Sequence, residues 1–142
     1  MDVAALPTSI HLEIVTPDRQ VVRDSVTAVT VPGKNGYLGI LPGHAPLLSI
    51  LEVGELAYTH ENVLHYVAVN WGFVEVLPDR VIILAQTAER AEEIDVDRAK
   101  RAKQRAEERL GKVTAADVDF ERARAAVARA LARLQTADRT RI

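Results

Sequence analysis

The sequence has no cysteine among its 142 residues, and aromatic side chains make up only 4% of it. Without cysteine the chain forms no disulfide, no catalytic thiolate and no zinc site with thiolate ligands. No stretch approaches the roughly 20 consecutive apolar residues that a membrane-spanning helix requires. Residues 1–7 also lack the basic start and long apolar run of a secretory signal. We therefore expect a cytosolic protein without thiol chemistry.

An excess of charge of one sign is also lacking. Lysine and arginine total 18 and aspartate and glutamate total 20, so the formal net charge is −2. A general nucleic-acid-binding protein would show a basic excess, and we expect no nucleic-acid partner. Hydrophobic residues make up 48% of the chain, which is enough for a core and too many for a disordered protein.

The composition changes near residue 87. Residues 1–87 hold all six prolines and carry four basic and nine acidic side chains, a net charge of −5. Residues 88–142 hold no proline, 14 alanines and 11 arginines, and carry a net charge of +3 from 14 basic and 11 acidic side chains. Proline marks turns, whereas alanine and arginine favour helices. We therefore expect two domains, a β domain over 1–87 and a helical domain over 88–142.

Short apolar runs with a period of two mark the first domain. Ile10, Leu12 and Ile14 alternate with other residues, and comparable runs follow at 67–69, 73–76 and 81–84. Turn sequences rich in proline and glycine separate these runs. This pattern predicts a β-sandwich or a β-barrel.

The second domain shows apolar or small residues at intervals of three and four, which predicts two helices. Asp95 is the expected N-cap of the first helix, and Gly111 is expected to end it in a left-handed conformation. The short connection makes the two helices antiparallel. The expected facing stripe consists of Ala99, Ala102, Ala106, Leu110, Phe120, Ala123, Val127, Ala130, Leu131 and Leu134.

No catalytic or metal-binding motif is found. The four histidines fall outside any helical metal motif, and Gly33-Lys34-Asn35-Gly36 lacks the serine or threonine of a phosphate-binding loop. No serine lies in a nucleophile elbow. We expect neither catalytic residues nor a bound metal, and the protein is not expected to be an enzyme.

Arginines form rows at helical spacing in the second domain. Arg98 and Arg105 share one face of the first expected helix, and Arg122, Arg129 and Arg133 share one face of the second. Guanidinium groups brought together would bind a polyphosphate well. The alternative is a solvated face of ordinary i,i+3 and i,i+4 ion pairs, and the pattern alone favours this alternative.

Three strings occur in fixed order at residues 39–48 (GILPGHAPLL), 69–76 (VNWGFVEV) and 87–95 (TAERAEEID). Together they strongly resemble one family, the epsilon subunit of bacterial and chloroplast rotary (F-type) ATP synthases. The resemblance extends from about Ile10 to Leu134. One departure is Trp71, because the family usually has a glycine at this position.

The resemblance implies a flattened β-sandwich of about ten strands, followed by an antiparallel helical hairpin. It also implies a non-catalytic central-stalk subunit that turns with the rotor of a proton-translocating enzyme. The sandwich would bind the gamma subunit and the ring of c subunits, with Tyr37, Leu41 and His44 as the expected contacts. The protein would be peripheral, at the cytoplasmic face of the bacterial cell membrane.

The helical hairpin would regulate ATP hydrolysis by extending into the alpha/beta catalytic head. In some bacterial members a motif at the start of the first helix helps to bind ATP, and the sequence from Ile94 to Ala99 matches it fully. The resemblance implies no required cofactor but suggests ATP as a regulatory ligand. The residues expected to bind it are Glu89, Ile94, Asp95, Arg98, Ala99, Arg105, Arg122, Arg129 and Arg133.

A different class of protein remains open at this point. The chain could be a free-standing β-sandwich adaptor whose helices bind another protein.

Overall fold

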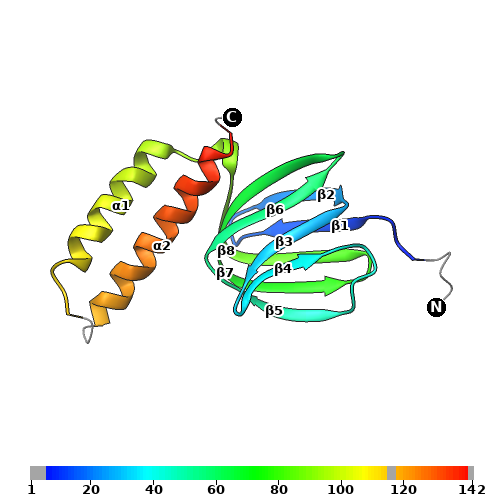
Figure 1. Cartoon of the computed structure of the whole chain (residues 1–142), viewed down its shortest axis with the longest axis horizontal. Helices are drawn as coiled ribbons and strands as arrows, with labels where there is room; N and C mark the ends of the chain where they lie inside the picture. Colours follow the sequence, from blue (N-terminus) through cyan, green and yellow to red (C-terminus); the bar gives the residue numbers. More distant parts are fainter. Residues whose placement is uncertain (1–5, 115–117, 141–142) are drawn as a thin grey trace.

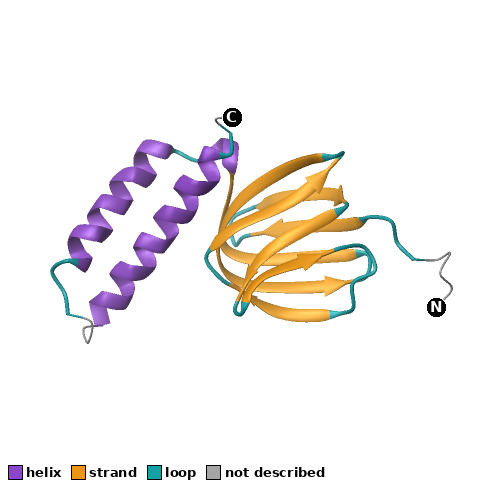
Figure 2. Cartoon of the chain, viewed as in Figure 1, coloured by secondary structure: helices purple, strands orange, loops and turns teal. Residues whose placement is uncertain are grey.

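The computed structural model describes residues 6–114 and 118–140 of the chain. Figure 1 shows a β body from which two helices project at one end, and Figure 2 shows that the two long helices and the strands occupy separate parts of the molecule. The strands are β1 (Ile10–Val15), β2 (Gln20–Val26), β3 (Ala28–Gly33), β4 (Gly36–Ile40), β5 (Leu47–Leu51), β6 (Gly54–His60), β7 (Val63–Leu77) and β8 (Arg80–Arg90). A 3₁₀ turn, η2 (Ala91–Glu93), leads to α1 (Val96–Leu110) and α2 (Val118–Asp138).

The two longest strands, β7 and β8, belong to both layers of the sandwich. The first half of β7 pairs with β6, where Val67 lies opposite Leu56, and its second half pairs with β5, where Phe73 lies opposite Ile50. One layer therefore has the order β2-β1-β8-β7-β5, and the other has β4-β3-β6-β7-β8. The sandwich is confirmed. Its eight described strands differ from the expected ten because β7 and β8 each supply a segment to both layers.

Where β7 passes from one layer to the other, the set of its residues that points into the core changes. In β7 the residues that belong to the sandwich core are Val67 and Val69 before this point and Val74 and Val76 after it, so the alternation shifts by one residue. Trp71 has a φ of +50° at the shift. A Cβ on Gly72 would lie 1.8 Å from the carbonyl oxygen of Leu84 in β8. Only glycine permits this backbone approach.

The core confirms the predicted strand pattern. Ile10, Leu12 and Ile14 are all buried, and they pack in one cluster with alternating residues of the other strands. The largest fully buried side chain is Tyr58, and burial raises the pKa of its hydroxyl group. The strand domain therefore has its own core, and none of the described residues of the helices belongs to it.

Two antiparallel helices follow, as predicted (Figure 1). Asp95 is the N-cap of α1, and its Oδ1 accepts a hydrogen bond of 3.0 Å from the backbone N–H of Arg98. Gly111 is the C-cap of α1, so the predicted end of the helix is confirmed. Its predicted left-handed conformation is wrong, because the residue has φ −71° and ψ −13°, a right-handed conformation. Small residues form the interface between the helices. The buried members are Ala99, Ala106, Ala123 and Ala130.

Two details differ from the sequence pattern. Leu131, expected in the stripe, is exposed on α2, since Ala130 and Leu134 already cover the facing side. Strand β8 continues to Arg90, beyond the change in composition at residue 87. Its last three residues pair with 67–69 of β7 although their composition is typical of a helix, because pairing with a neighbouring strand overrides local preference.

We predict that Gly72→Ala destabilises the β body by about 3 kcal/mol or more, because the new methyl group would overlap a backbone carbonyl. Urea-induced unfolding measures this change. Gly39→Ala is the matched control. No atom lies within 4 Å of its Cβ position, so its stability should change by no more than about 0.5 kcal/mol. Equal stabilities of the two variants would contradict this account of the strand crossing.

Candidate functional site

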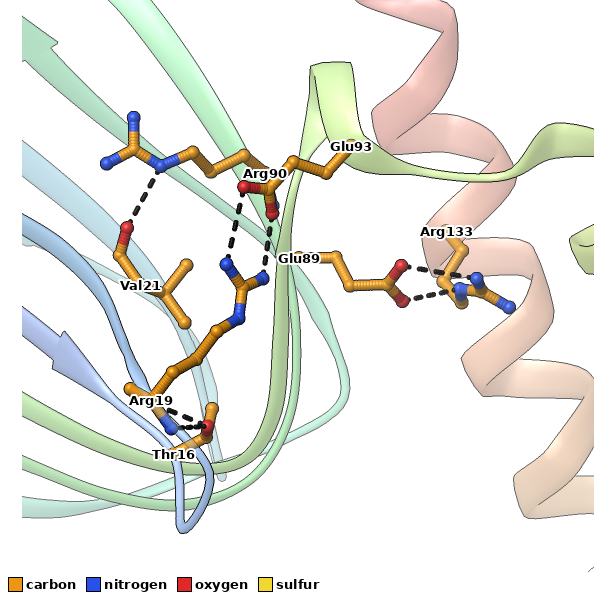
Figure 3. Close-up of polar contacts among 7 residues, drawn as sticks. All are labelled: Thr16, Arg19, Val21, Glu89, Arg90, Glu93 and Arg133. Atoms are coloured by element: carbon orange, nitrogen blue, oxygen red, sulfur yellow. Dashed lines mark hydrogen bonds and ion pairs between the residues drawn. The ribbon is translucent and has the colours of Figure 1, made fainter.

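The junction between the β body and the helices is held by two arginines (Figure 3). Arg90 Nε donates a hydrogen bond of 2.9 Å to the carbonyl oxygen of Val21 in β2. Arg19, in the turn before β2, donates to both carboxylate oxygens of Glu93, at 2.8 and 3.3 Å. The hydrogen bond from Arg19 holds the pKa of Glu93 below its usual range, so this carboxylate stays charged at lower pH than an ordinary glutamate does. The start of the helical hairpin is therefore tied to the first hairpin of the sandwich.

The second half of α2 rests on the outer surface of the β body. Ile94 packs with Ala68 of β7 and Ala137 of α2 in a small buried cluster. Nearby, Arg133 Nε lies 2.7 Å from Glu89 Oε1, and Arg133 Nη2 donates a hydrogen bond of 3.2 Å to Glu89 Oε2 (Figure 3). The shorter of these contacts is an ion pair that is not aligned as a hydrogen bond.

A second ion pair lies where α2 ends. Arg139 donates three hydrogen bonds of 2.9 to 3.3 Å to the carboxylate of Glu55, whose side chain is only 7% exposed. The same guanidinium lies 4.8 Å from the centroid of the Tyr66 ring. A buried carboxylate is stable only with such a partner, so lifting α2 from the sandwich leaves Glu55 unpaired.

A cleft of about 360 Å³ lies between the hairpin and the β7–β8 surface. Its floor is made by two pairs of facing residues, Ala68 with Glu89 and Asn70 with Thr87. The helices form its walls. The wall residues are Arg98, Ala102, Ala126, Arg129, Ala130, Ala132 and Arg133.

A second cleft of about 510 Å³ opens between the two helices. Arg105 and Arg122 line it, and it shares Ala102, Ala126 and Arg129 with the first cleft. The two clefts therefore adjoin. The first brings together Glu89, Arg98, Arg129 and Arg133, and the second brings Arg105 and Arg122 to the same Arg129.

The arginines of the two clefts differ in their partners. Arg133 is paired with Glu89, and Arg122 Nη1 lies 4.0 Å from Asp119 Oδ1. Within residues 6–114 and 118–140, Arg98, Arg105 and Arg129 form no ion pair. Guanidinium groups without carboxylates attract anions, and phosphate oxygens match their geometry.

The other residues of the predicted ATP motif shape the start of α1. Ile94 belongs to the buried cluster, Asp95 caps the helix, and Ala99 is fully buried between the helices. None of the three lines either cleft. Two cleft residues, Asn70 and Thr87, were not predicted. The sequence feature that could have identified Asn70 is an amide side chain within the largely apolar run from Val67 to Val76.

An apolar row crosses the outer face of β5, β7 and β8. Ile50 lies opposite Phe73, and Phe73 lies opposite Leu84. Phe73 is 56% exposed and Leu84 52% exposed, and Trp71 is exposed beside them. These four side chains and Arg129 line a groove of about 800 Å³. Sequence patterns did not identify this row, because pairing across strands brings its members together.

The predicted contact residues lie in a different place. Tyr37 is exposed on β4, and Leu41 is exposed at the start of the loop that follows. His44 lies in the same loop, with its Nδ1 2.7 Å from the carbonyl oxygen of Ala45. Tyr37 and Leu41 present apolar surface to solvent, as a protein contact requires.

Comparison with known proteins identifies the family. The family model "ATP synthase, Delta/Epsilon chain, beta-sandwich domain" matches residues 9–91, and "ATP synthase, Delta/Epsilon chain, long alpha-helix domain" matches residues 92–138. The chain belongs to the ATP synthase delta/epsilon chain family. The boundary between these matches lies just after β8 rather than at residue 87.

Relatives of this ATP synthase family include several bacterial epsilon chains. An ATP synthase epsilon chain of Koribacter versatilis is 61% identical over 100 residues, 70% of each chain. That of Solibacter usitatus is 50% identical over 134 residues, which cover 94% of this chain and 99% of the relative. A chain in the Euglena gracilis mitochondrial ATP synthase has the same fold, with a TM-score of 0.80 at 23% identity over 96% of this chain and 86% of that one.

The chain is thus an ATP synthase epsilon chain, a non-catalytic subunit of that complex. This membership favours an ATP synthase subunit over the free-standing adaptor. Among the helices of the described residues, none is both long and apolar enough to cross a membrane.

We predict that Arg139→Ala loosens the hairpin of this epsilon subunit, because it leaves the buried Glu55 carboxylate without its partner. Amide hydrogen exchange should become faster along the second half of α2, while the core strands keep their protection. Arg124→Ala is the control, since its pair with Glu121 is exposed on the same helix. Unchanged exchange in α2 of the Arg139 variant would show that this ion pair does not hold the hairpin.

Proposed function

We propose that this epsilon subunit turns with the rotor, bound to the gamma subunit and to the ring of c subunits at the cytoplasmic face of the bacterial membrane. Its bacterial relatives and the exposed apolar surfaces of the β body support this proposal. Two solved structures of the same fold come from ATP synthase assemblies that include the c-ring. In this arrangement the stiff sandwich transmits torque.

We propose that the row of Ile50, Phe73 and Leu84 binds the gamma subunit. Three large side chains in register on adjacent strands form a continuous apolar surface, and Trp71 extends it. Such surfaces on a protein mark the centre of an interface. The loop after β4, with Leu41 and His44, together with Tyr37 on β4 supplies the second contact, toward gamma and the ring.

The hairpin regulates ATP hydrolysis by leaving the β body and extending into the alpha/beta head. The contacts that must break include the apolar cluster around Ile94, the contact of Arg139 with the Tyr66 ring, and two ion pairs, Arg133–Glu89 and Arg139–Glu55. Alanine-rich surfaces bury little apolar area, so the free energy that separates the docked and extended states is small on the scale of ligand binding.

We further propose that ATP binds the docked hairpin and holds it down. The observation that carries this proposal is the presence of three guanidinium groups without ion-pair partners among the described residues, Arg98, Arg105 and Arg129, along two adjoining clefts. A ligand that binds only the docked state stabilises it by about 2.7 kcal/mol at a hundredfold excess over its Kd. High ATP then permits rotation, and low ATP releases the hairpin to stop wasteful hydrolysis.

We predict that Arg98→Ala and Arg129→Ala each weaken ATP binding at least about tenfold, since a hydrogen bond to a charged group contributes roughly 1.5–3 kcal/mol. Arg98→Lys should bind ATP nearly as weakly as Arg98→Ala, because lysine cannot form the two parallel hydrogen bonds of a guanidinium group. Calorimetry on the whole chain measures these affinities. Arg124→Ala, on α2 and outside both clefts, should bind like the wild type. An absence of heat at millimolar ATP, or equal binding by all variants, would rule out the nucleotide site.

For the gamma interface, Phe73→Asp and Leu84→Asp should each weaken the complex at least about tenfold, because each puts a charge into a desolvated apolar contact. Affinity is measured by titrating purified gamma subunit. Val63→Asp is the control, as Val63 is equally exposed at the other end of β7. If the Val63 variant loses as much affinity as the Phe73 variant, the row is not the interface.

A further inference from the structure

Trp71 has a backbone conformation that bulky side chains rarely adopt. Three described residues other than glycine have a positive φ, and two of them, Glu61 and Asn62, form the tight turn between β6 and β7. Trp71 instead lies within β7, with φ +50°. A left-handed conformation is unfavourable for a residue with a Cβ, whereas glycine adopts it freely. The crossing of β7 between the layers therefore explains the conformation but not the presence of a tryptophan.

Contacts within the chain do not offset this strain. The cross-strand pairs of β7 and β8 pass from Asn70–Thr87 to Gly72–Ala85, and Trp71 has no partner between them. Trp71 is 52% exposed, and within residues 6–114 and 118–140 its ring takes part in no aromatic stacking or cation–π contact. A strained and half-exposed tryptophan is unfavourable for the folding of the subunit alone. Backbone strain of this kind is concentrated where proteins bind ligands or partners.

The surface around Trp71 suits one partner. Trp71 lines the groove of about 800 Å³ together with Ile50, Phe73 and Leu84, the row that we assign to the gamma subunit. The lining residues of this groove include no carboxylate, and Arg129 is their one charged member. An apolar segment of gamma with an acidic side chain beside Arg129 therefore complements the groove in polarity and in charge.

We infer that Trp71 is the principal anchor of the gamma subunit, the side chain whose burial contributes most to the affinity of the complex. Tryptophan is enriched among the few interface residues that carry most of the binding energy. In the complex, gamma covers the exposed part of the ring and supplies an acceptor for the indole N–H, because a buried indole N–H needs such a partner. The inference rests on the proposed gamma interface and adds the residue that dominates it.

The first test titrates purified gamma subunit into the whole chain without nucleotide. Trp71→Gly and Trp71→Ala should each weaken the complex at least about tenfold, since both remove the ring. Only glycine also relieves the backbone strain, so Trp71→Gly should unfold at a higher urea concentration than Trp71→Ala. Val63→Gly, at a comparably exposed position of β7, is the matched control and should bind gamma like the wild type. Arg129→Gln should lower the affinity less and reduce its dependence on salt, and an unchanged salt dependence would contradict the acidic contact.

The second test observes the ring itself. Trp71 is the one tryptophan of the chain, so labelling with fluorotryptophan gives a single fluorine NMR signal. In the free subunit this signal should differ between light and heavy water, because the ring is half exposed. Addition of unlabelled gamma should move the signal and remove the solvent difference, as the ring becomes buried. An unchanged signal in the saturated complex would overturn the inference.

The remaining outcomes separate this inference from the proposed interface. If Phe73→Asp loses affinity and Trp71→Gly does not, gamma binds the row but Trp71 is not its anchor. If neither variant loses affinity, the row is not the interface and the inference fails with it. If Trp71→Gly binds gamma far better than Trp71→Ala, the backbone conformation rather than the ring decides binding. A fluorine signal that changes with the concentration of the free subunit, and not with gamma, would overturn the inference in favour of a second copy of this chain.

Discussion

The close approach of Gly72 to the carbonyl oxygen of Leu84 determines how the two longest strands are arranged. Because no side chain separates the backbones there, β7 and β8 turn over together and pass from one layer of the sandwich to the other. Before the crossing, Ala68 and Asn70 face the hairpin. After it, Phe73 faces outward in the apolar row. A single strand pair therefore carries both the surface on which the helical hairpin rests and the proposed gamma interface.

This shared strand pair brings the two surfaces close together. Arg129 of α2 lines the cleft beneath the hairpin and also the groove beside Trp71 and Phe73. In our proposal, its guanidinium lies between the nucleotide on one side and the gamma interface on the other. The positive φ of Trp71 explains why glycine is the usual residue there, and the tryptophan side chain adds apolar area to the groove.

Arginines of the helical domain divide into two groups by what faces them. Arg133 and Arg139 meet carboxylates of the β body and hold the hairpin against it. Arg98, Arg105 and Arg129 meet none among the described residues, and their charge remains available to an anion. The same residue type thus serves docking in one group and, in our proposal, ligand binding in the other. The two groups differ because Glu55 and Glu89, which are far from these arginines in sequence, form ion pairs only with Arg139 and Arg133.

The sequence by itself determined those features that depend on near neighbours along the chain. Alternation at Ile10, Leu12 and Ile14 predicted a strand, Asp95 predicted the start of α1, and the alanine stripe predicted the antiparallel hairpin. The three characteristic strings also indicated the family, because each is a run of adjacent residues. These signals are local, since a strand repeats every two residues and a helix every three to four.

Only the tertiary structure decided which side chains meet across large separations in sequence. It placed Asn70 beside Thr87 under the hairpin, aligned Phe73 with Leu84 on the outer face, and paired Arg139 with Glu55. It also carried β8 beyond the change in composition, because strand pairing outweighs helical preference. Periodicity cannot show whether a charge meets a carboxylate or whether an amide is left without a partner, since both depend on how distant segments pack.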